Sequence, residues 1–140
     1  MSDGSGHILV PISVGELMDK ISILEIKSER IANQIQRENV LRELEALRAV
    51  DLGAVDHAML ERSRGELRRV NAQLWDVEDA IRECDAQGDF GSAFVELARS
   101  VYRLNDARAR IKKEINLASG SLLVEEKSYK SFQPPEGGGG

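Results

Sequence analysis

Two rows of polar side chains are the part of this sequence best suited to chemistry. Asn105, Arg108, Lys112 and Asn116 follow one another at steps of 3, 4 and 4, so they would share one face of a helix. A second row in residues 64–82 has steps of 4, 3, 4, 3 and 4; its members are Arg64, Arg68, Asn71, Trp75, Glu78 and Arg82. Arginine, lysine and side-chain amides on facing helices can hold a carboxylate or a phosphate.

Arg108 admits two interpretations, because it also falls in an apolar series. A charged side chain at such a position must find a carboxylate, reach out to solvent or line a pocket, since a buried unpaired charge costs several kcal/mol. Glu25 and Glu29 are candidate partners for a structural ion pair, which we favour over a ligand site. Trp75 is expected to pack at a helix junction, with stacking on a ligand as the alternative.

Signatures of enzyme catalysis are weak. Cys84, the only cysteine, has no neighbouring histidine, and no glycine loop has the form that cradles phosphates. His7 and His57 lack a further ligand at metal-binding spacing. We therefore predict no catalytic residue, no metal site and no cofactor. If the protein is an enzyme, Arg68, Arg108 and Lys112 would hold an anionic metabolite, and Glu25 or Glu78 would carry a proton.

Three apolar series predict the helices that position these rows. The central series runs from Leu60 to Cys84, and its eight members alternate in steps of three and four. Similar series run from Leu17 to Ile35 and from Phe90 to Ile115. They predict an all-α, antiparallel three-helix bundle resembling a coiled coil, in which the first and third helices run parallel and both oppose the second.

The helix ends are predicted from capping residues. Ser13 with Glu16 has the form of a capping box, and Gly88 and Gly120 suit left-handed ends of the second and third helices. The first apolar series changes phase beyond Ile35, which predicts a break within 36–39; the alternative is one long helix whose exposed face changes. A short extra helix to about residue 50 would follow and stop near Gly53.

Composition limits the function classes. A formal net charge of -5 argues against a nucleic-acid binder. No stretch has the length and apolarity of a signal core or a membrane span, so we expect a cytoplasmic protein without a membrane partner. We expect a disordered segment at 1–7, one helical domain at 8–132 with extended ends, and a disordered Pro/Gly tail at 133–140. Residues 122–124 would fold back over the bundle or support a homodimer.

Several motifs resemble a family of small uncharacterised bacterial proteins. They are PISVGEL (11–17), DKISILEIK (19–27), NAQLWDVE (71–78), ELARSVY (96–102), Asn105-Asp106 and LVEEKSY (123–129). The resemblance implies no established activity, only a loose association with genes for cell-surface glycans and glycosyltransferases. It draws attention to polar residues that a plain bundle does not need, among them Lys127 and Tyr129.

These observations favour a non-enzymatic binding or scaffold module. Its expected partner is an anionic small molecule or an acidic protein, held at the basic stripe between the second and third predicted helices. The alternative is a small helical enzyme, or an accessory of one, acting on a phosphorylated or carboxylated metabolite. The candidate ligand-binding residues are Arg68, Asn71, Trp75, Asn105, Arg108, Lys112, Asn116, Lys127 and Tyr129.

Overall fold

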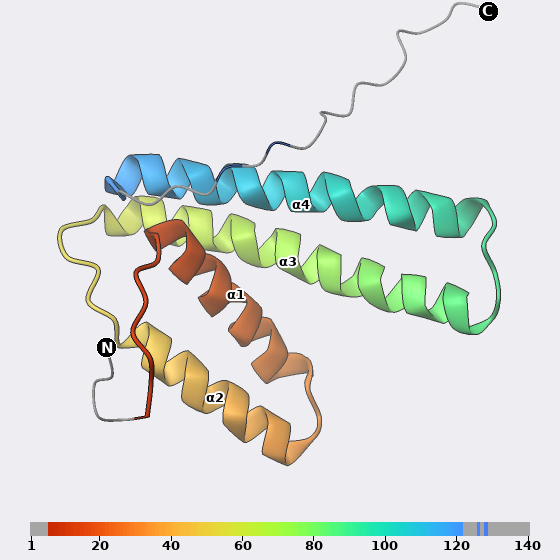
Figure 1. The fold of residues 1–140 in the computed structure, drawn as a ribbon, viewed down its shortest axis with the longest axis horizontal. Coiled ribbons are helices and arrows are strands. Elements are labelled where there is room, and N and C mark those ends of the chain that lie inside the picture. The colour runs from red at the N-terminus through yellow and green to blue at the C-terminus, as the bar shows by residue number, and fades with distance from the viewer. Residues whose placement is uncertain (1–5, 122–125, 127, 129–140) are drawn as a thin grey trace, which may run out of the picture.

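The protein consists of four packed α-helices in a computed structural model that describes residues 6–121, 126 and 128. The helices are α1 (Val14–Arg30), α2 (Gln34–Arg48), α3 (His57–Ala86) and α4 (Ser92–Ser119). The longest two, α3 and α4, form a hairpin. Helix α1 lies across the half of this hairpin in which α3 begins and α4 ends, and α2 packs on the side of α1 that faces away from the hairpin (Figure 1). This confirms the all-helical prediction. None of the helices in the described part of the chain combines the length and apolarity that a membrane span requires.

The start of α1 is fixed by the predicted cap and by a close approach to α4. The Ser13 hydroxyl accepts a hydrogen bond from the Glu16 backbone N–H at 3.0 Å. Gly15 then lies directly against α4, where a Cβ atom would come within 2.5 Å of the Lys112 carbonyl oxygen. Only glycine lets the two backbones approach this closely, so Gly15 sets how α1 docks.

The break after α1 lies earlier in the chain than we predicted. Asn33 caps α2 by accepting from the Gln36 N–H at 3.0 Å, so 36–39 is helical and the break falls at 31–33. Ile35 is 72% exposed and does not continue the apolar series of α1. The extra helix ends at Arg48, and Gly53 lies in the following connection with a φ of 71°.

The ends of α3 and α4 lie where the capping residues predicted them. Asp56 caps α3, Gly88 follows it with a φ of 67°, and Gly120 ends α4 with a φ of 70°. The short connection brings α4 back along α3 in the opposite direction (Figure 1). The predicted antiparallel relation of these two helices is therefore correct.

The predicted direction of α1 is wrong. The Gly15 N–H donates to the Asn116 Oδ1 at 2.7 Å, near the end of α4, while Ile23 lies beside Arg108, further back along α4. The first helix thus runs opposite to α4, not parallel to it, and starts at the same end of the molecule as α3 (Figure 1). The reason is α2, which returns the chain to the end where α1 began before α3 starts.

The core is concentrated where α1 covers the hairpin. Leu67 of α3 and Ile115 of α4 are fully buried, and Val70 and Leu74 are 8% exposed, as the apolar series predicted. Beyond the end of α1 the same series continues through Val77 and Ile81, which are only half-buried. The core also includes Val40 and Leu44 of α2, so all four helices contribute to it at one end, and the other end is a two-helix hairpin.

Candidate functional site

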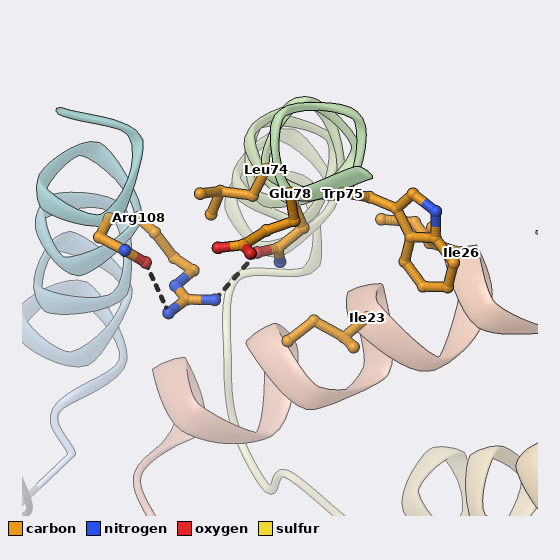
Figure 2. Close-up of a pocket in the computed structure, with 8 residues that line it drawn as sticks. Ile23, Ile26, Leu74, Trp75, Glu78 and Arg108 are labelled. Carbon is orange, nitrogen blue, oxygen red and sulfur yellow. Dashed lines mark hydrogen bonds between the residues drawn. The ribbon is translucent and has the colours of Figure 1, made fainter. Parts of the chain in front are cut away.

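Arg108 lies half-buried where α1, α3 and α4 meet, and its guanidinium is held by two amides. Its Nη2 donates to Asn105 Oδ1 at 2.9 Å, and its Nη1 donates to Asn71 Oδ1 at 3.3 Å (Figure 2). Within the part of the chain that the structure describes, Arg108 forms no ion pair with a carboxylate. The amides orient the guanidinium but leave its charge uncompensated.

The carboxylates expected to pair with Arg108 serve other arginines. Glu25 is only 7% exposed and accepts hydrogen bonds from Arg64 at 3.1 Å and Arg68 at 3.3 Å. It also forms an ion pair with Arg48 at 3.2 Å. The exposed Glu29 pairs with Arg68. The expected ion pair of Arg108 with Glu25 or Glu29 is therefore wrong. These carboxylates form an ion-pair cluster with other arginines, which ties α1 to α2 and α3.

The carboxylates of this cluster also shift the pKa of Arg64. The Glu61 carboxylate, one turn earlier on α3, is the largest cause of a raised pKa of Arg64, with Glu25 contributing further. Burial opposes this shift. Glu25 is thus a buried carboxylate among three cations, which is the position of a structural anchor.

Asn71 is held in place by buried partners from α1. Its side-chain amide donates to Asp19 Oδ1 at 2.9 Å and to the Ser22 Oγ at 2.7 Å. Both donors of the amide are therefore satisfied, and its oxygen is left to face Arg108. The network fixes the rotamer of Asn71 and, through it, the position of the guanidinium.

Lys112 and Asn116 have structural contacts with the start of α1. Lys112 is 9% exposed, and its Nζ contacts Glu16 Oε2 at 2.6 Å and Asp19 Oδ2 at 3.7 Å. The hydrogen bond from Lys112 is the main reason that the pKa of Glu16 is lowered. Asn116 is 1% exposed and accepts the Gly15 N–H. Both residues join α1 to α4.

A pocket of about 260 Å³ opens beside Arg108. Figure 2 shows Arg108 on one side of it and Trp75 on the other, with Glu78 reaching in from α3 and Ile23 below on α1. The residues that line it are Ile23, Ile26, Asn71, Leu74, Trp75, Glu78, Asn105 and Arg108. One end of the pocket is therefore charged and polar, and the other is apolar.

The apolar end is anchored by the only tryptophan. Trp75 is half-buried, and the guanidinium carbon of Arg30 lies 5.8 Å from the ring centroid, within cation–π range. Arg30 also pairs with Asp76 at 2.7 Å. The ring is thus held at the junction of α1 and α3, as we expected, and it also contributes to the pocket wall.

A second hollow of about 200 Å³ lies between α1 and the connection from α2 to α3. Its two arginines, Arg48 and Arg64, are already paired with Glu25. Among the described residues, no group of three or more His, Cys, Asp or Glu side chains could hold a metal ion. The Arg108 pocket is therefore the stronger candidate site.

The fold brings together five of the predicted site residues and separates the rest. Around the pocket lie Asn71, Trp75, Glu78, Asn105 and Arg108. Arg68, Glu25, Lys112 and Asn116 belong to the structural contacts described above, and Lys127 and Tyr129 lie outside the described residues.

Sequence reasoning missed the wall that α1 provides. Ile23 and Ile26 are not members of the apolar series that begins at Leu17. Two further isoleucines on another face of the same helix signal a second buried surface. That signal was present in the sequence and could have placed α1 against the polar rows.

Comparison with known proteins gives a family but no function. No curated protein and no solved structure matches the chain significantly. The model of DUF6165, described as a family of unknown function, matches residues 8–135, which cover most of the chain and include the whole candidate site. The chain therefore belongs to this family of unknown function, in agreement with the resemblance of its motifs.

Proposed function

We propose that this protein is a non-enzymatic binding module that recognises an anionic group through Arg108. The observation that carries the proposal is a half-buried guanidinium that lines a pocket and has two neutral amides as its partners. A cation in this position gains from a ligand that supplies the negative charge. The proposed setting, a bacterial cytoplasm, follows from the motif resemblance and the composition alone.

The geometry supports a ligand carboxylate or phosphate. Asn71 and Asn105 each take one N–H from a terminal nitrogen of Arg108, so each terminal nitrogen retains another N–H. Two N–H groups of a planar guanidinium match the two oxygens of a carboxylate or phosphate. Because the amides already hold the side chain, little conformational entropy is lost when a ligand binds.

The shape of the site favours a small molecule over an acidic protein. The polar groups converge on a pocket about 260 Å³ in volume, and its apolar wall would pack against the body of a ligand. The arginines that could have made a wide basic stripe, such as Arg64 and Arg68, are neutralised by Glu25 and Glu29. A homodimer through the C-terminal segment stays a separate prediction.

Ligand screening by thermal shift tests the proposal. Carboxylates, phosphorylated metabolites and nucleotide sugars are screened against the wild type, Arg108→Met and Arg110→Met; Arg110 is an exposed arginine on the same helix and serves as the control. A ligand at 100 times its Kd stabilises by about 2.7 kcal/mol, which raises Tm by several degrees. We expect this shift in the wild type and Arg110→Met only. Equal shifts in all three proteins, or none in any, would refute the proposal.

One observation favours a second candidate, an enzyme. Glu78 lines the same pocket as Arg108 and is positioned to exchange a proton with a bound carboxylated or phosphorylated metabolite. Glu78→Gln tests it once a ligand is known. An enzyme would lose turnover of that ligand with binding retained, whereas a binding module would convert no ligand in either form.

A further inference from the structure

We infer that the pocket accepts a small zwitterion with an apolar body, of the kind represented by an α-amino acid with an aromatic or aliphatic side chain. This inference rests on the proposed function of Arg108 as an anion holder. It adds that the ligand also carries a cationic group, which Glu78 receives. Three features of the pocket carry it.

The first feature is a pair of opposite charges that do not neutralise each other. Arg108 and Glu78 line one pocket from α4 and α3, and no ion pair joins them. Glu78 binds Arg82 on the outside through Oε2 at 2.9 Å, and among the described residues its Oε1 accepts no hydrogen bond. A ligand with an anionic and a cationic group can satisfy both side chains.

The second feature is the direction of the apolar wall. Arg108 and Trp75 stand on opposite sides of the pocket, and Ile26 lies next to Trp75 (Figure 2). A ligand with its carboxylate on Arg108 would therefore extend its body toward Trp75 and Ile26. Ile26 is itself buried at 3% exposure, so the apolar surface that a ligand could cover is that of the half-buried Trp75 and Ile23.

The third feature is size and charge balance. The pocket has a volume of about 260 Å³, which matches the size of a small ligand body. A ligand with several negative charges would also meet the carboxylate of Glu78. A compact molecule without net charge, with both charges close together at one end, fits these limits best.

The experiment compares three probes that differ only in charged groups: L-phenylalanine, 3-phenylpropionate and 2-phenylethylamine. Their Kd values are measured by titration calorimetry or NMR with the wild type, Glu78→Gln and Arg108→Met; Arg108→Lys is added as a variant that keeps the charge. Circular dichroism checks that each variant is folded. Inorganic phosphate serves as the simple anion.

L-Phenylalanine should bind the wild type most tightly. Loss of its ammonium, or of the Glu78 charge, should weaken binding about two- to fivefold, as for a partly solvent-exposed charge pair. In Glu78→Gln, L-phenylalanine and 3-phenylpropionate should then bind alike. Arg108→Met should weaken both by about tenfold or more, and Arg108→Lys by less.

The outcomes separate this inference from the proposed function. If 3-phenylpropionate or phosphate binds through Arg108 at least as tightly as L-phenylalanine, the zwitterion inference is wrong and the anion site stands. If L-phenylalanine does not bind the folded wild type, the inference is also wrong. If no anion binds in a way that depends on Arg108, both fail.

Discussion

Glu25 anchors three arginines, so the substitution Glu25→Gln should destabilise the protein far more than an equivalent change at its exposed neighbour Glu29. The Glu25 side chain is 9% exposed and lies 3.1–3.3 Å from the nearest guanidinium nitrogens of Arg48, Arg64 and Arg68. Glutamine preserves the shape but removes the negative charge. One of its terminal atoms also becomes a donor that faces cations.

The expected loss of stability depends on the burial of the Glu25 carboxylate and on the exposure of its three arginine partners. A hydrogen bond to a charged group contributes about 1.5–3 kcal/mol when well buried. The arginine side chains here are 34%, 39% and 53% exposed, so solvent screening reduces each contact to roughly 0.5–1 kcal/mol. Three such contacts give a loss of about 1.5–3 kcal/mol. For a chain of this length, Tm should fall by roughly 5–12 °C.

Glu29→Gln is the matched control. The Glu29 side chain is 57% exposed, and among the described residues it pairs with Arg68 alone, so its loss should cost at most about 1 kcal/mol. Thermal and urea unfolding, followed by circular dichroism, give both values. A Glu25→Gln protein whose Tm lies within 2–3 °C of the Glu29→Gln protein would show that the Glu25 cluster does not anchor α1.

Other consequences can be tested in the same assays. Gly15→Ala should destabilise by roughly 2 kcal/mol or more, because its Cβ would lie 2.5 Å from the Lys112 carbonyl oxygen. Gly65→Ala should instead stabilise by up to about 1 kcal/mol, since among the described residues no atom apart from the local helix backbone lies within 4 Å of its Cβ position in α3. Urea unfolding that gives both alanine variants the same sign would contradict this. The pKa of Glu16 is below its usual 4.5 in the folded protein, so its stabilising contribution is present above about pH 4.5 and is lost as the pH falls through the folded-state value. Glu16→Gln should therefore lose stability at pH 7 and flatten the acid limb of the stability curve, and an unchanged acid limb would be contrary evidence.

Helix positions were largely predictable because the signals are local. The Ser13 cap binds an N–H three residues away, and the φ of Gly88 and Gly120 follows from their position after a helix. The apolar series of α3 predicted the burial of Leu67 through helix periodicity alone. One local signal was overlooked. Asn33 caps α2 and places the helix break before Ile35, whereas the apolar spacing had assigned Ile35 to the first helix.

The direction of α1 and the partners of Arg108 were decided only by the tertiary structure. The Gly15–Asn116 hydrogen bond joins residues 101 positions apart, and the Lys112–Glu16 ion pair joins residues 96 apart. Several carboxylates in the sequence are chemically suitable for Arg108, and periodicity places them on helix faces without stating which faces meet. By itself the sequence determined the helices, their ends and the polar rows. The return of the chain through α2 decided that Glu25 meets three other arginines, which leaves Arg108 with two amides beside a pocket.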